Sequence, residues 1–458
     1  MRIVILGAGQ VGATLAEQLS GESNDITVVD ANAGRLRTLQ DRLDIRTVEG
    51  RASFPSVLAQ AGCADADMLV AVTNSDEVNM VACQLAQSLF NIPRKVARIR
   101  GSSYLGCADQ LFRTGAIPVD VLISPEQLVT DHIEQLTRWP GALQVHDFMD
   151  GLVKLAVFRV GSGSGLRGHT VSELDSLLPG VEVRIVALYR GEAHVSLHGD
   201  LQFLPGDEVY MIATPAHLEA VTQLFVGNRQ RYRQIMIAGG GNIGASLAAR
   251  LEARFNVKVI EVRPERCREI ANMLDAAVVI NGSVSELDIL TEEGIDEVDL
   301  FCALTNDDEA NVMSSMLAKR AGARRVLTII NNPAYVDLVD GNIIDYAISP
   351  EQITIGSLLA YIRKGDVTRV HALRKGKAEA LETVVHGDNK TSRVVGRQVG
   401  ELKLPTDARI GAIVRGNRVI MSHADTRIES EDHLIFFMTS KQSLKQVEKL
   451  LQVGLGYF

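Results

Sequence analysis

The chain has few cysteines and aromatic residues, no CxxC pair and no long hydrophobic run. Its five cysteines, without paired spacing, argue against a disulfide framework or a zinc site and favour buried free thiols in a reducing compartment. They are Cys63, Cys83, Cys107, Cys267 and Cys302. No apolar run approaches the roughly 18 residues that a membrane-spanning helix needs. The first residues pass directly into a glycine motif, which leaves no room for a secretory signal. We therefore expect a soluble, cytoplasmic protein.

The chain also lacks a basic block, and its formal net charge is −9. Nucleic-acid-binding domains concentrate lysine and arginine on one face, so we expect no nucleic-acid partner. The apolar fraction of 46% is enough for real hydrophobic cores and argues against disorder. A length of 458 residues predicts about three or four domains.

One pattern is written twice along the chain. The motif Gly-Ala-Gly-Gln-Val-Gly at residues 7–12 returns as Gly-Gly-Gly-Asn-Ile-Gly at residues 239–244, a shift of 239 − 7 = 232 residues. At the same shift, residues 50–79 and 282–311 are identical at 11 of 30 positions. A single GxGxxG motif is weak evidence, whereas two copies within the same flanking pattern indicate duplicated nucleotide-binding units. The repeat is too long for a solenoid, so each copy should comprise whole domains.

Each copy alternates short apolar runs with helical patterns, which is typical of a doubly wound parallel sheet. The expected strands are 3–6, 26–29, 46–48, 68–72, 96–99 and 121–123 in the first copy, and 235–238, 257–261, 300–304 and 326–329 in the second. Both copies close with Ser-Pro-Glu-Gln, at residues 124–127 and 349–352, followed by a helix with an apolar stripe. We expect two Rossmann-like α/β domains.

A strand-rich segment with hairpin turns follows each of these helices, at residues 190–192 and 415–417, and ends in a helix at 216–225 or 441–451. These segments predict two small α+β domains. We interpret His146 and His371 as bystanders in the linkers before them. The predicted domains are residues 1–131, 140–228, 229–356 and 366–458, in the order nucleotide-binding, small, nucleotide-binding, small.

The glycine turns carry the predicted chemistry. Gly7 permits the tight turn, Gly9 lets the backbone approach a pyrophosphate, and Gly12 lets the helix pack on the strand. Asp30, 30 − 12 = 18 residues further on, can accept hydrogen bonds from ribose hydroxyls. Its charge would repel a 2′-phosphate, so we expect NAD⁺ or NADH rather than NADP(H). In the second copy Gly239, Gly241, Gly244 and Glu261 take the same parts. The alternative is a glycine turn that serves packing alone.

Polar residues at other strand ends complete the predicted site. Thr73 and Asn74, with Thr305 in the second copy, can bond a cofactor, or the stretch can supply a helix N-cap instead. Arg51 and Arg98 can pair with phosphates. We take their counterparts to be the uncharged Ser283 and Thr328, so the two sites should differ. The predicted cofactor-binding residues are Gly7, Ala8, Gly9, Gln10, Val11, Gly12, Asp30, Arg51, Thr73, Asn74, Arg98, Gly239, Gly240, Gly241, Asn242, Ile243, Gly244, Glu261 and Thr305.

Catalytic constellations are missing from the sequence. All ten histidines lie outside the two nucleotide-binding domains proper, and no metal-ligand cluster is visible. We therefore predict a binding protein without catalytic or metal-ligating residues. The alternative is an NAD-dependent oxidoreductase whose substrate site is not apparent from the sequence.

The glycine motif with Asp30, the Thr-Asn strand end, the Ser-Pro-Glu before a helix and the Pro-Gly-Asp-Glu-Val strand at residues 205–209 resemble RCK domains, which regulate conductance of potassium. Two in tandem resemble the cytosolic NAD-binding subunits of bacterial Trk-type potassium uptake systems. The resemblance implies RCK N-terminal domains alternating with RCK C-terminal domains, and nucleotide-dependent control rather than catalysis.

The same resemblance implies partners and a location. The expected partner is a TrkH-like membrane subunit that translocates potassium, at the cytoplasmic face of the inner membrane. About four chains would form a homo-oligomeric ring of eight RCK units. We also expect ATP or ADP as an alternative ligand at one of the two sites.

Overall fold

The computed structural model describes residues 1–20, 24–226, 232–332, 335, 344–362, 367–374, 377–440 and 443–451. These residues form two parallel six-stranded sheets that alternate along the chain with two antiparallel five-stranded sheets. The expected fold class, two Rossmann-like domains alternating with two small α+β domains, is confirmed. The exact domain bounds stay a prediction, and the predicted bounds at residues 228, 229, 366 and 458 lie outside the described residues, as does Lys441.

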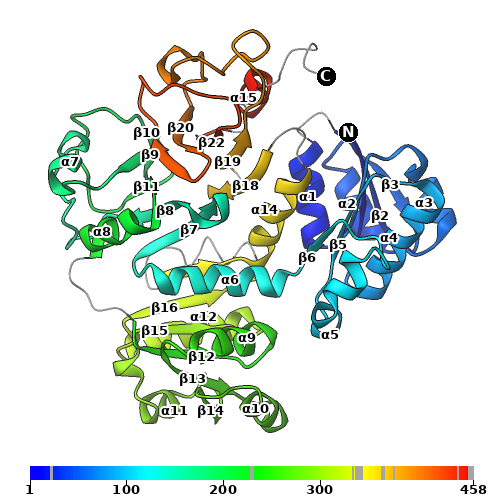
Figure 1. The fold of residues 1–458 in the computed structure, drawn as a ribbon. Helices are drawn as coiled ribbons and strands as arrows, with labels where there is room; N and C mark the ends of the chain where they lie inside the picture. Colours follow the sequence, from blue (N-terminus) through cyan, green and yellow to red (C-terminus); the bar gives the residue numbers. More distant parts are fainter. Residues whose placement is uncertain are drawn as a thin grey trace. The chain divides into compact units, whose positions relative to one another are not determined.

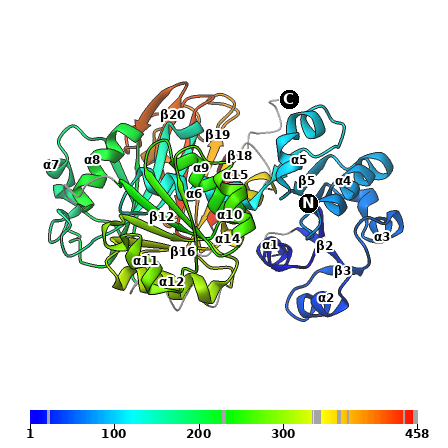
Figure 2. The ribbon, with the colours of Figure 1, turned by 90° about the horizontal axis from the view of Figure 1, so that it is seen from below.

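The first parallel sheet has the strand order β3-β2-β1-β4-β5-β6. The order reverses at β1, so the carboxyl ends of β1 and β4 form a switch point, the usual place for a ligand in such sheets. Its strands are apolar runs buried by helices that surround the sheet (Figure 1 and Figure 2). The elements are β1 (Arg2–Leu6), α1 (Gln10–Ser20), β2 (Asp25–Asp30), α2 (Ala33–Gln40), β3 (Arg46–Glu49), α3 (Pro55–Gln60), β4 (Met68–Ala71), α4 (Asp76–Phe90), β5 (Arg94–Arg98), α5 (Ser102–Gly106) and β6 (Val121–Ile123).

The second parallel sheet repeats this order as β14-β13-β12-β15-β16-β17. It includes two strands that were not predicted, β14 and β17. Its elements are β12 (Gln234–Ala238), α9 (Asn242–Leu251), β13 (Asn256–Glu261), α10 (Pro264–Ala271), β14 (Val278–Asn281), α11 (Leu287–Glu292), β15 (Leu300–Ala303), α12 (Asp308–Arg320), β16 (Arg325–Ile329) and β17 (Tyr346–Ile348).

The helix that follows each parallel sheet packs on the opposite copy. Helix α14 (Pro350–Ile362) contacts α1, where the Thr14 hydroxyl donates to Glu351 Oε1 at 2.6 Å. The later part of α6 (Pro125–Arg138) pairs through Glu134 with Arg250 on α9. The chain accordingly divides into two compact units, residues 1–129 with 350–362, and residues 130–349 with 363–458. Each nucleotide-binding domain thus borrows a helix from the other half of the sequence.

The small domains are antiparallel sheets with the expected hairpins, β9–β10 and β20–β21. Each also contains a strand, β7 or β18, in a stretch predicted to be a linker. The elements are β7 (Ala142–Phe148), β8 (Val153–Arg159), α7 (Leu174–Leu177), β9 (Val183–Arg190), β10 (Ala193–Val195), β11 (Asp207–Ala213) and α8 (Pro215–Val226), then β18 (Val367–Leu373), β19 (Ala378–Val384), β20 (Ala408–Arg415), β21 (Arg418–Met421), β22 (His433–Met438) and α15 (Leu444–Leu451).

The two small sheets share one hydrophobic core. Apolar side chains of β8, β9 and β11 pack with those of β19, β20 and β22 in a single buried cluster. The backbones approach closely at Gly411 on β20, where an added Cβ would lie 2.2 Å from Ile212 Cδ1 of the first small domain. The second parallel sheet and both small domains therefore belong to one continuous unit.

The expected location of His146 and His371 in linkers is wrong, whereas their interpretation as bystanders is not contradicted. They lie on β7 and β18, with ring centroids 4.6 Å apart, and His132 on α6 is 6.0 Å from His146. Burial lowers the pKa of His132 and of His371 to about 4, and it lowers the pKa of His146 well below its ordinary value. The three imidazoles are therefore neutral where the small domains meet α6.

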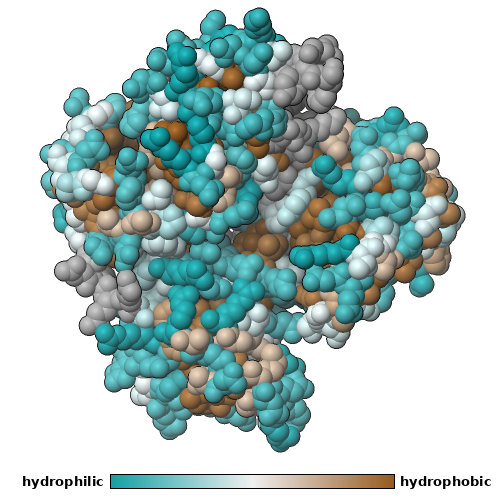
Figure 3. Space-filling model, in the orientation of Figure 1, coloured by the Kyte–Doolittle hydropathy of each residue, from teal (hydrophilic) through white to brown (hydrophobic). Residues whose placement is uncertain are grey.

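The surface and the cysteines partly match expectation. The face in Figure 3 is mostly hydrophilic with scattered hydrophobic side chains. All five cysteines are free thiols, but only Cys63, Cys83 and Cys302 are buried, whereas Cys107 is exposed and Cys267 is intermediate. The expectation of uniformly buried thiols is thus wrong for the last two. Burial raises the pKa of Cys63 and of Cys83 to about 12.

Candidate functional site

The first glycine turn joins β1 to α1, and its three glycines do different work. Gly7 has a φ of +107°, a backbone conformation that residues with a side chain rarely adopt. Its amide donates to Val29 O at 2.7 Å. An added Cβ at Gly12 would lie 1.9 Å from Gly7 O, so the helix packs against the turn only without a side chain there. An added Cβ at Gly9 would meet nothing within 4 Å. Packing explains Gly7 and Gly12, whereas Gly9 leaves open space in front of the backbone.

Asp30 stands at the end of β2, beside this turn. The Ala8 amide donates to Asp30 Oδ2 at 2.7 Å, and the Asn32 amide donates to Oδ1 at 2.8 Å. Each carboxylate oxygen thus holds one backbone amide and keeps acceptor capacity. The open space at Gly9 and the half-buried carboxylate fit a dinucleotide, whose pyrophosphate would lie at the start of α1 and whose ribose would meet Asp30.

The second turn repeats this geometry between β12 and α9. Gly239 has a φ of +103°, a Cβ at Gly244 would lie 2.0 Å from Gly239 O, and Gly241 faces open space. Glu261 ends β13 in the place of Asp30 and is 6% exposed. The Gly240 amide donates to its Oε2 at 2.9 Å. Burial opposes ionisation, but the hydrogen bonds and the Arg263 charge outweigh it and lower the pKa of Glu261.

Thr73 is engaged within the protein. Its hydroxyl donates to Asn79 Oδ1 at 2.7 Å, and Thr305 makes the same bond to Asn311 at 2.6 Å. The N-cap of α4 is Ser75, whose side chain accepts from the Val78 amide. Asn74 is exposed and lies next to the switch point. The alternative of a structural N-cap therefore holds for Ser75, and the hydroxyls of both threonines already have partners.

Arg98, at the end of β5, is the most suggestive of the predicted cations. Its Nε is buried and has no hydrogen-bond partner among the described residues. Burial and the nearby Arg100 lower its pKa from the ordinary value. A half-buried guanidinium with an unsatisfied donor is suited to a phosphate. Arg51 is exposed, and its guanidinium lies 5.9 Å from the centre of the Phe54 ring.

The second copy lacks both charges, although one counterpart was assigned wrongly. Ala71 pairs with Ala97, and Ala303 pairs with Thr328, so Arg98 corresponds to Ile329 rather than to Thr328. A one-residue difference between the repeats shifts this alignment. Thr328 is buried and bonds to Ser315 at 2.6 Å. Ser283 remains the counterpart of Arg51, so the second copy has no charge at these two positions, but Arg263 and Arg266 bring guanidinium groups to its glycine turn.

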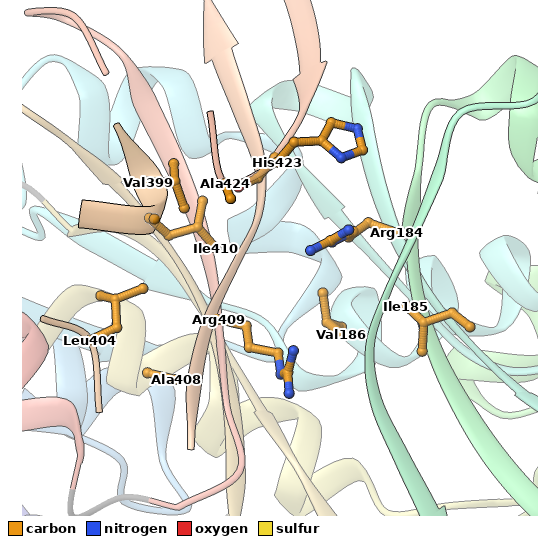
Figure 4. Close-up of a pocket in the computed structure, with 12 residues that line it drawn as sticks. Arg184, Ile185, Val186, Val399, Leu404, Ala408, Arg409, Ile410, His423 and Ala424 are labelled. Atoms are coloured by element: carbon orange, nitrogen blue, oxygen red, sulfur yellow. The ribbon is translucent and has the colours of Figure 1, made fainter. Parts of the chain in front are cut away.

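A pocket that the sequence did not indicate lies between the small domains. It has a volume of about 190 Å³ and is lined by residues of β9 and β20 with neighbouring loops. Arg184 from β9 and Arg409 from β20 reach into the space between the strands (Figure 4). Burial and the nearby Arg409 lower the pKa of Arg184. Arg184 and Arg409 each stand six residues before a hairpin turn and carry no motif, so only the packing of the sheets reveals this pocket.

Among the described residues, no group of three or more histidine, cysteine, aspartate or glutamate side chains is arranged to hold a metal ion. None of the helices described is both long enough and apolar enough to cross a bilayer.

Comparison with known proteins matches the observed domain order. The model of the TrkA-N domain family matches residues 3–125 and 235–350, and that of the TrkA-C domain family matches residues 155–226 and 389–452. The chain is 53% identical over 458 residues to the Trk system potassium uptake protein TrkA of Halomonas elongata, covering 100% of both chains. It is 50% identical over 452 residues to the protein of the same name from Vibrio alginolyticus, covering 99% of each.

A solved structure, that of the GsuK RCK domain, aligns with 98% of this chain and 94% of its own, at a TM-score of 0.62 and 18% identity. At this level of identity, the similarity shows a shared fold. With full-length relatives at half identity and tandem TrkA-N and TrkA-C domains, the chain belongs to the TrkA family of Trk system potassium uptake proteins.

Proposed function

We propose that this chain is a regulatory subunit that binds NAD⁺ or NADH and controls a Trk-type potassium transporter in the membrane. The observation that carries the proposal is the first switch point. There, Gly9 faces open space, Asp30 keeps a free acceptor on each oxygen, and Arg98 has an unsatisfied donor. The role in potassium uptake is inferred from two relatives that are 53% and 50% identical to this chain and are named as potassium uptake proteins.

The proposed binding residues are those predicted from the sequence, but they are expected to contribute unequally to binding. Gly9 and Asp30 in the first copy, and Gly241 and Glu261 in the second, provide the backbone cradle and the ribose acceptor. Thr73 and Thr305 are expected to contribute less, because their hydroxyls and their backbone amides already donate to Asn79 and Asn311 within the protein. ATP or ADP at one of the two sites is part of the same proposal, since each carries the adenosine and phosphates that this geometry recognises.

Regulation is favoured over catalysis by the histidines. An oxidoreductase needs a group that transfers a proton beside the nicotinamide. The three histidines instead pack against one another on α6, β7 and β18, elements other than those that carry the glycine turns. We therefore propose no catalytic residue and no metal. Sustained turnover of NADH with any metabolite would replace this proposal by the oxidoreductase alternative.

Output then requires a partner. A ligand shifts a conformational equilibrium only when it binds two states with different affinity. We propose that the nucleotide-bound and nucleotide-free states of this chain differ in how they contact a TrkH-like potassium-translocating subunit, at the cytoplasmic face of the inner membrane. A homo-oligomeric ring of about four chains, as the resemblance to RCK proteins implies, would couple the sites to one gate.

Deletion of the gene tests the physiological role. Cells without this chain should take up potassium poorly while the level of the membrane subunit, measured by immunoblot, stays normal. Wild-type chain expressed from a plasmid should restore uptake. Normal uptake in the deletion strain would contradict the proposal.

A further inference from the structure

The carboxylates of the two glycine-turn sites differ in how many acceptor positions remain open. A carboxylate offers about four lone-pair positions, two on each oxygen. Asp30 uses one on each oxygen, for the amides of Ala8 and Asn32. One position is left on each, which matches the two neighbouring hydroxyls of a ribose. The first site can accept both hydroxyls at once.

Glu261 is more fully occupied. Its Oε2 accepts from the Gly240 amide at 2.9 Å. Its Oε1 accepts from both the amide and the guanidinium Nε of Arg263, each at 3.0 Å. Oε1 thus has no position left, and Glu261 can receive one ribose hydroxyl but not two. Burial of Glu261 to 6% exposure leaves little room for it to turn toward another donor.

The extra donor comes from one residue. Arg263 stands two residues after the carboxylate, as Asn32 does in the first copy, and both backbone amides bond the carboxylate alike. The Asn32 side chain turns away and caps α2 by accepting from the Arg35 amide. The Arg263 guanidinium turns back onto Glu261. The difference between the sites at this point is therefore a side chain, not the backbone path.

The geometry points to Arg263 as an internal competitor for the ribose position of the second site, so that it sets a lower affinity there for NAD-type ligands. This inference rests on the proposed nucleotide binding and names a specificity-determining residue within it. Because the Arg263 side chain is 64% exposed, the ion pair is weak and a ligand can displace it. The effect is a shift in affinity rather than closure of the site.

Reciprocal exchange between the copies tests the inference in the full-length chain. The Gly9→Ala background removes binding at the first site, so that titration calorimetry with NADH reports the second. In that background Arg263→Asn and Arg263→Ala should each tighten binding about tenfold, as expected for one hydrogen bond to a charged group. In the otherwise wild-type chain, Asn32→Arg should weaken the first site by a similar factor.

A double-mutant cycle separates competition from a structural role. With Glu261→Ala in place, Arg263→Asn should change NADH affinity no further, because the contested acceptor is gone. If the wild-type chain binds NADH but neither the Arg263 variants nor Asn32→Arg change the affinity, the inference is overturned and the proposed function stands. A wild-type protein that binds no NADH would overturn both. Thermal unfolding identifies any variant that fails to fold, and the Asn32→Arg exchange then decides alone.

Discussion

Asp30 is the residue on which the first site depends most. Replacing it by Ala removes the acceptors for both ribose hydroxyls, so NADH binding should weaken by about 1–3 kcal/mol. Asp25→Ala is a matched control, because Asp25 lies at the other end of β2 and is exposed. Titration calorimetry measures both. Equal affinity of the Asp30→Ala variant and the control would refute the assignment.

Gly9 and Gly12 give opposite predictions within one turn. Gly9→Ala adds a methyl group to open space, so stability should hardly change while the pyrophosphate loses its close approach and NADH binding is lost. Gly12→Ala forces a Cβ against Gly7 O, which should lower the free energy of unfolding by about 1–3 kcal/mol. Denaturant unfolding and NADH titration of both variants check this. A destabilised Gly9→Ala variant would mean that packing alone explains the glycine.

At the scale of elements, β7, β18 and α6 bring three neutral histidines together, which makes stability depend on pH. In the unfolded chain a histidine has a pKa of about 6.5, whereas in the folded protein the pKa of His132 and of His371 is about 4. Stability present above pH 6.5 should therefore be lost as the pH falls from 6.5 toward 4. Replacing His146 by Phe should make this decline shallower in denaturant unfolding measured across that range. An equal slope would show that the cluster does not titrate as described.

The doubly wound sheets were predictable because their central strands are apolar runs that end at glycine turns. The edge strand Val278–Asn281 was missed although Val278, Val279 and Ile280 form a short apolar run, at the shift of 278 − 46 = 232 residues from the expected strand 46–48. The strands at Ala142–Phe148 and Val367–Leu373 were missed because polar residues interrupt their apolar pattern, including His146 and His371, which are partly buried by contacts distant in sequence. Gly9 and Asp30 were found by spacing, whereas Arg263 and the pocket at Arg184 depend on tertiary packing.

For the whole molecule, the exchange of α6 and α14 ties the two halves of the chain together. Each half alone would lack the helix that its nucleotide-binding domain packs against, so comparison of the two sites belongs in the full-length chain.

Potassium flux through the co-purified translocating subunit, reconstituted with this chain, tests nucleotide-dependent control most directly. Flux is measured without nucleotide and with NAD⁺, NADH, ATP or ADP, using the wild-type chain and the Asp30→Ala variant. We predict that at least one nicotinamide nucleotide changes the flux of the wild-type complex, and that the variant needs a higher concentration for the same change. Flux that ignores all four nucleotides would contradict the regulatory account.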